Sequence, residues 1–204
     1  MLKLNNISIA YKLAVLLIIS IVGVGVVGYT GYSHLLKANQ DMNSMYQDRL
    51  IAVKLINENI GHFRFIQACV FESMVTVDEV RKEAVVKAIG LRDESFNKNI
   101  IEYEKNNLNA NEIEQMKEMK IAIEKYRDGR NKIIELARQN KNAEAYQEYM
   151  TYVLPYSNVF IDLLKKIAED NTKVADELNK QNGEAFVRAK IASCNGISWF
   201  CHWA

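Results

Sequence analysis

Apolar residues in this chain form one unbroken run near the start and regularly spaced stripes further on. The run covers residues 13–32, and no charged residue occurs between Lys12 and Lys37. A helix needs roughly 20 apolar residues to cross a bilayer, whereas the apolar core of a cleaved signal peptide usually has ~7–15. We therefore expect a lead at residues 1–12, followed by a transmembrane helix that is not cleaved.

The charges that flank the apolar run predict its orientation. Lys3 and Lys12 precede the run and Lys37 follows it. Basic residues are enriched on the cytoplasmic side of membrane helices, and tyrosines are enriched at the membrane interfaces. We expect a single-pass protein of the cell membrane with a cytoplasmic N-terminus, an extracytoplasmic body, and Tyr29 and Tyr32 at the outer interface.

Three turn signals divide the rest of the chain into four helices. Thr76 with Glu79, and Asn109 with Glu112, each have the spacing of a capping box, which marks a helix start. The polar stretch 139–142 separates the third helix from the fourth. Between these signals, apolar residues recur at alternating spacings of three and four, as in helices that pack together. The second helix is expected to bury Val80, Ala84, Ala88, Leu91, Phe96, Ile100 and Tyr103.

Short turns between long helices make neighbouring helices antiparallel. The sequence therefore predicts an all-α protein in which the membrane helix runs directly into an up-down-up-down four-helix bundle over residues 33–190. Pro155 lies inside the fourth helix, where a proline removes one backbone hydrogen bond, so we expect a kink there.

Composition narrows the possible functions. The chain has 204 residues, of which 49% are apolar and 25% charged, and its net charge is +1. This charge gives no attraction for nucleic acid, and no basic run is interleaved with aromatic residues. No nucleophile–base pair, phosphate loop or paired-acid arrangement stands out in the sequence. We expect no enzyme activity, no cofactor and no nucleic-acid partner.

Five residues of the bundle are candidates for binding a small anion. Counted from the turns, they fall within roughly one and a half helical turns of one another in height. They are Arg64, Arg127, Arg130, Tyr152 and Tyr156. Guanidinium groups can grip a carboxylate, although such residues can also be solvated flanks and amphipathic packing. Arg130 sits at a core position and needs a partner, either the ligand or a carboxylate such as Glu83 or Glu148.

Arg49 also occupies a core position, nearer the membrane helix. Its height in the bundle coincides with that of Glu169 and Asp170 on the fourth helix. We interpret Arg49 with Glu169 and Asp170 as an internal ion pair that fixes the register of the helices, with no part in ligand binding.

Two segments carry a resemblance to a known family. They are NISIAYKL, from Asn6 to Leu13, and MYQDRLIAVKLI, from Met45 to Ile56. With the four helices, they make the stretch from Asn6 to about Lys190 similar to the sensor half of bacterial methyl-accepting chemotaxis proteins. Similar modules occur in histidine kinases and cyclic-nucleotide enzymes, and a non-sensing helical spacer is a further alternative.

The resemblance implies a homodimer that senses a small molecule, directly or through a binding protein. It also implies that ligand shifts the fourth helix along its axis, and that a second membrane helix carries this shift to a cytoplasmic output. The ligand, the lipid bilayer and a second copy of the chain are the expected partners.

The segment IASCNGISWFCHWA at residues 191–204 has an unusual composition. One interpretation is a metal site at Cys194, Cys201 and His202, although three ligands make a weak case and we expect no metal. Another is an aromatic segment at the membrane interface, since the stretch is too short to span a bilayer. We favour a third, in which out-of-frame or truncated sequence replaces the second membrane helix.

Overall fold

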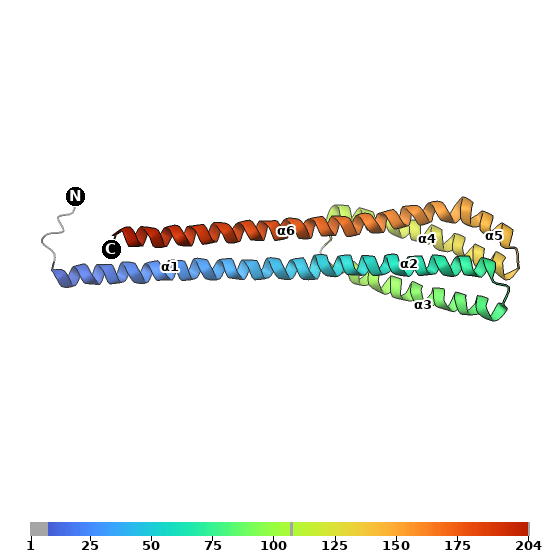
Figure 1. Ribbon diagram of the computed structural model, residues 1–204, viewed down its shortest axis with the longest axis horizontal. Coiled ribbons are helices and arrows are strands. Elements are labelled where there is room, and N and C mark those ends of the chain that lie inside the picture. Colours follow the sequence, from blue (N-terminus) through green and yellow to red (C-terminus); the bar gives the residue numbers. More distant parts are fainter. Residues whose placement is uncertain (1–7, 107, 204) are drawn as a thin grey trace. The chain divides into compact units, whose positions relative to one another are not determined.

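The computed structural model describes the backbone of residues 8–106 and 108–203, and side chains as far as residue 191. Every regular element within these ranges is a helix (Figure 1). The chain divides into two compact units, which are described separately. The first holds the segments before Met45 and after Asp176, and the second is Met45–Asp176.

The first unit contains helix α1, Ile9–Ser44, which includes the apolar run. None of its residues is buried, and large apolar side chains such as those of Leu16 and Ile18 are about 60% exposed. By length and composition this helix is able to cross a membrane, and its helical backbone continues to Val75. Exposed apolar side chains all around a helix are expected where lipid replaces water as the solvent.

The other segment of the first unit is the end of helix α6, Leu154–Trp203. The sequence predicted that the fourth helix would end near Lys190, whereas the helical backbone continues to Trp203. The side chains of Cys194, Cys201 and His202 lie outside the described residues, so the metal interpretation of this segment is not addressed by the structure.

The second unit is the four-helix bundle. Its elements in chain order are the π-helix η2 (Met45–Leu50), α2 (Ile51–Val75), α3 (Glu79–Tyr103), α4 (Ala110–Arg138), α5 (Asn142–Glu148), the π-helix η3 (Tyr149–Val153) and the first part of α6. Helix α2 contacts α3, α4 and α5, while α4 also contacts α3, α5 and η3. The segments α5, η3 and α6 together form the fourth helix, as Figure 1 shows. The predicted all-α four-helix bundle is confirmed.

The capping signals explain where two of the helices begin. Asn109 and Glu112 form the predicted capping box at the start of α4. At α3 the prediction was two residues early, because Asp78 is the N-cap and its carboxylate accepts from the backbone N–H groups of Val80 and Arg81. The side chain of Asp78 thus satisfies two N–H groups that have no partner within the helix.

The core contains a cluster of aromatic rings contributed by all four helices. The ring of Phe63 lies 4.6 Å from Tyr126 and 4.6 Å from Phe160, and Phe96 lies 5.6 Å from Phe160. All four residues are at most 3% exposed. These contacts bring α2, α3, α4 and α6 together around one apolar centre.

The buried face of α3 differs from the prediction in its first half. Val80 and Leu91 are 80% and 57% exposed, and Ala84 is also exposed. Three residues replace them in the core: Lys82, Val85 and Ile89. Lys82, Val85, Ile89 and Phe96 are spaced by three, four and seven residues and share one helical face, whereas Leu91 lies five residues before Phe96 and on another face. The prediction was right for Phe96, Ile100 and Tyr103.

Pro155 lies two residues after the end of the π-helical turn η3, in the first turn of α6. A proline inside an α-helix has no N–H and its ring clashes with the carbonyl group four residues earlier. A π-helical turn changes the hydrogen-bond spacing by one residue, and such turns often occur at functional sites. The sequence predicted a kink at this place, and the structure has η3 there.

Candidate functional site

The end of the bundle where the chain enters at Met45 and leaves at Asp176 contains a polar network, which we call the entry-end node. It consists of Arg49, Tyr103, Glu112 and Asn171, one residue from each helix of the bundle. Arg49 Nη1 lies 2.8 Å from Glu112 Oε1 and donates to Asn171 Oδ1 at 3.0 Å. Asn171 Nδ2 donates to the hydroxyl oxygen of Tyr103 at 3.1 Å.

Glu112 has two roles in the node. Its Oε2 accepts from the backbone N–H of Asn109 at 2.8 Å, which completes the capping box of α4. Its Oε1 accepts from Arg49, and the Glu112 side chain is 3% exposed. One carboxylate therefore caps the start of α4 and neutralises a largely buried guanidinium group, so the node holds the four helices in register.

The predicted partners of Arg49 were wrong, although an internal ion pair does form. Glu169 is exposed to solvent. Asp170 accepts from Gln115 Nε2 at 2.9 Å, and this hydrogen bond lowers the pKa of the Asp170 carboxyl group below its usual value. The residue of α6 that faces Arg49 is Asn171, one position further on, and the carboxylate comes from α4.

The two arginines of α4 share one carboxylate on α3. Arg130 Nη1 lies 2.8 Å from Asp93 Oδ2, and Arg127 Nη2 lies 3.4 Å from Asp93 Oδ1. Arg127 also donates to Asn97 Oδ1 at 2.8 Å, and its guanidinium carbon lies 5.6 Å from the centre of the Phe96 ring. The Arg130 side chain is 7% exposed, so this ion pair is mostly withdrawn from water.

The carboxylates expected for Arg130 have other partners. Glu83 pairs with Arg138 at 2.9 Å, and Glu148 pairs with Lys132 at 2.7 Å. Arg130 does have a carboxylate partner, as the sequence indicated, but this partner is Asp93, ten residues after Glu83 on α3. Asp93 therefore neutralises the charge of Arg130, while Arg130 Nη1 and Arg127 Nε are buried without a hydrogen-bond acceptor among the described residues.

The five candidate ligand residues do not form one site. Arg64 is exposed on α2, while Arg127 and Arg130 are held by Asp93. Tyr152 and Tyr156 are half-buried, and their rings are 5.3 Å apart. Of the five, Tyr152 lines a groove between α4 and the fourth helix.

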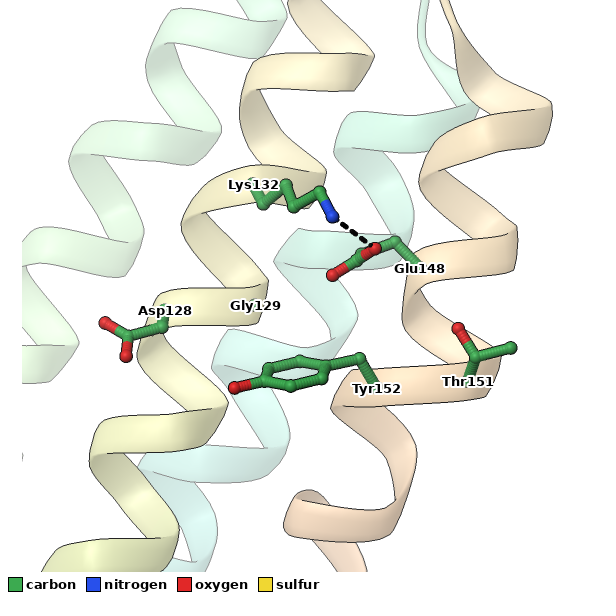
Figure 2. A pocket seen from close by; sticks show the side chains of 6 residues that line it. All are labelled: Asp128, Gly129, Lys132, Glu148, Thr151 and Tyr152. Carbon is green, nitrogen blue, oxygen red and sulfur yellow. Dashed lines mark hydrogen bonds and ion pairs between the residues drawn. The ribbon is translucent and has the colours of Figure 1, made fainter.

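The groove lies between α4 and the α5–η3 segment, and we call it the α4–η3 groove. Its volume is about 450 Å³, and it is lined by Asp128, Gly129, Lys132, Glu148, Thr151 and Tyr152. Figure 2 shows the Tyr152 ring reaching from η3 toward α4, with the Lys132–Glu148 ion pair above it. The ring and the ion pair thus bound the groove at two different heights.

Gly129 is the reason why η3 can approach α4 so closely. A Cβ atom at this position would lie 2.5 Å from Val153 Cγ2 and 2.7 Å from Tyr152 Cδ1, closer than van der Waals contact allows. The sequence reasoning missed Asp128, Gly129 and Lys132. A glycine in the middle of a helix was the available signal, because it costs about 1 kcal/mol relative to alanine and often has a packing reason.

The charges in the groove do not cancel. Lys132 and Glu148 neutralise each other, and Asp128 has no ion-pair or hydrogen-bond partner among the residues that the structure describes. The lining residues therefore carry one excess negative charge, on the Asp128 carboxylate, which Figure 2 shows pointing away from the Tyr152 ring. Among the described residues, no group of three His, Cys, Asp or Glu side chains is placed to hold a metal ion.

The chain also matches a known family. A family model described as "Four helix bundle sensory module for signal transduction" matches residues 6–186. This match includes α1, the complete bundle and part of α6 beyond it. A comparison with curated proteins finds no match.

Proposed function

The chain belongs to the family of four-helix-bundle sensory modules for signal transduction, and we propose that it is the membrane-anchored sensor of a small ligand in a chemoreceptor. The observation that carries this proposal is the extent of the match. It covers both the helix that is able to cross a membrane and the whole bundle that follows it. A catalytic role has no comparable support.

The outer helices of the bundle support a relay by helix movement. Helical backbone connects α1 to α2 without a break, and α6 leaves the bundle as one continuous helix. A small shift of either helix within the bundle is therefore passed along its axis. We place the N-terminus in the cytoplasm and the bundle outside it, with two copies of the chain forming a homodimer.

We place ligand binding in the α4–η3 groove. The anionic ligand expected from Arg64, Arg127 and Arg130 has lost its main support, because Asp93 pairs with the last two. The groove retains Tyr152 from that set, and the Tyr156 ring contacts it at a tilted angle of 60°. One side of the groove is formed by η3, so a bound molecule touches the helix that leaves the bundle as α6.

Thermal unfolding of the full chain in detergent micelles tests direct sensing. The protein is heated alone and with a panel of amino acids, organic acids and amines. A ligand at 100 times its Kd stabilises the folded state by about 2.7 kcal/mol, which raises the melting temperature by several degrees. Stabilisation by at least one class of compound is expected. An unchanged melting temperature across the whole panel contradicts direct sensing and favours a helical spacer.

The orientation has a separate test. Lys98 is exposed on α3, and a Lys98→Cys variant places a reactive thiol on the bundle. A membrane-impermeant maleimide should label this variant on intact bacterial cells more strongly than it labels the parent chain. Equal labelling of the two proteins on intact cells, with stronger labelling of the variant after lysis, would place the bundle in the cytoplasm.

A further inference from the structure

We propose that the α4–η3 groove selects a small organic cation, such as a protonated amine. This inference deepens the proposed function, on which it rests, by naming the chemical class of the ligand. It reverses the sign of the charge that the sequence suggested. Three features of the groove support this proposal: the unpaired carboxylate of Asp128, the ring of Tyr152, and the pairing of Lys132 with Glu148.

The first feature is the carboxylate of Asp128. It is exposed, lines the groove, and has no ion-pair or hydrogen-bond partner among the described residues. An ammonium group that donates to this carboxylate forms a charge-assisted hydrogen bond, which is about twice as strong as a neutral one. The lining provides this acceptor on α4, and Figure 2 shows its carboxylate pointing away from Tyr152, so the exposed Asp128 side chain turns toward the groove when it binds an ammonium group.

The second feature is the ring of Tyr152. It extends across the groove toward α4, as Figure 2 shows, and Tyr156 supports it at a ring distance of 5.3 Å. A cation within ~6 Å of an aromatic ring centre is attracted by the negative face of the ring. Gly129 keeps this wall in place, since any larger residue would push Tyr152 and Val153 away from α4.

The third feature excludes anions. Lys132 is the basic residue of the lining, and its Nζ lies 2.7 Å from Glu148 Oε2. An entering carboxylate would have to displace Glu148 and would meet the unpaired charge of Asp128. A cation meets neither obstacle, because the ion pair stays intact. Electrostatics alone therefore discriminates between an amine and an acid of the same size.

Isothermal titration of the full chain in micelles with butylammonium tests the inference. Butanol and butanoate serve as neutral and anionic probes of the same length. We expect butylammonium to bind at least tenfold more tightly than either. The Asp128→Asn variant should weaken this binding at least tenfold, whereas Asp162→Asn, which removes an exposed charge on α6, should leave it unchanged within twofold.

Variants of Tyr152 separate the ring from its hydroxyl group. Tyr152→Phe should bind butylammonium within threefold of the parent chain, and Tyr152→Leu should lose about tenfold in affinity. The far-ultraviolet circular dichroism of each variant shows whether its helices are retained. Asp128 is exposed, so the Asp128→Asn variant should fold without any change in the packing of the core.

Each outcome decides the inference. Tighter binding of butanoate that is lost in Lys132→Gln shows an anion site and overturns the cation proposal, while the sensor function stands. Binding of butylammonium that Asp128→Asn leaves unchanged places the cation elsewhere and also overturns it. If none of the three probes binds but the thermal panel finds another ligand, the groove assignment is wrong and sensing is retained.

Discussion

The entry-end node and the α4–η3 groove contain the same kinds of polar side chain, but these side chains are all paired in the node and only partly paired in the groove. In the node, Arg49, Glu112, Asn171 and Tyr103 come from four helices and satisfy one another. In the groove, Asp128 has no described partner and one side consists of a π-helical turn. A polar residue holds the fold when another helix supplies its partner, and it remains available for a ligand when none does.

Asp93 and its two arginines form a third polar cluster, in which one carboxylate is shared by two cations. Arg130 is almost fully buried and Arg127 is half-buried, yet both are paired with one carboxylate. Their presence at core positions looked like a ligand site in the sequence. The comparison with the groove shows that burial of a cation indicates a structural partner, whereas an unpartnered charge beside a cavity is the better indication of a ligand.

The largest effect should come from breaking the node. Glu112→Ala removes the capping carboxylate of α4 and leaves Arg49 unpaired, so we expect a loss of about 3–5 kcal/mol in the free energy of unfolding. Urea denaturation followed by circular dichroism measures it. Glu114→Ala is the matched control, because Glu114 is 60% exposed and should cost less than about 0.5 kcal/mol. Similar losses in both variants would show that the node contributes nothing special.

Removal of the carboxylate between the arginines should rank second. Asp93→Asn leaves the buried guanidinium group of Arg130 without its counter-charge, and we expect a loss of about 2–3 kcal/mol. Asp128→Asn removes the same charge from the groove and should cost less than about 0.5 kcal/mol. The same denaturation measurement compares them. If Asp128→Asn is the more destabilising of the two, the distinction between structural and available carboxylates is wrong.

Two glycine-to-alanine variants, one at Gly129 and one at Gly90, test the close approach of η3 to α4. Gly129→Ala places a Cβ atom against Val153 and Tyr152, so the free energy of unfolding should fall by about 1–3 kcal/mol. Gly90→Ala lies on an exposed face of α3 with nothing within 4 Å of the new atom. Alanine is the better helix former, so this variant should gain about 0.5–1 kcal/mol. Thermal melts of the two variants should therefore shift in opposite directions, and a shift in the same direction would exclude the packing role of Gly129.

The smallest effect should appear at alkaline pH. Burial raises the pKa of Tyr103 to about 12, against a weaker opposing effect of the hydrogen bond from Asn171. Tyr103 stays neutral in the folded protein while its unfolded form ionises near pH 10, so stability should fall as the pH rises from about 10 to 12. Tyr103→Phe removes this contribution and should flatten the decline. Tyr46→Phe, at a 53% exposed tyrosine, should leave the decline unchanged, and equal slopes for all three proteins would contradict the assignment.

Local signals predicted the fold well, and partners across helices were harder to predict. The spacing of Asn109 and Glu112 fixes a capping box within four residues, and the apolar run requires no tertiary information. By contrast, the partner of Arg130 depends on which face of α3 packs against the bundle, and the predicted apolar stripe had the wrong face before Phe96. A shift of one residue moves a side chain by about 100° around a helix, which explains why Asn171 faces Arg49 where Asp170 was expected.

Hydrogen–deuterium exchange of the full chain in lipid nanodiscs tests the central claim, that the bundle is fixed at the entry end and responsive at the groove. Without ligand, we predict that the amides of η3 exchange at least tenfold faster than those of α4 near Glu112. Butylammonium should slow exchange in η3 and leave the entry end unchanged. Equal exchange at both ends without ligand, or ligand protection that appears at the entry end and not in η3, would contradict this account.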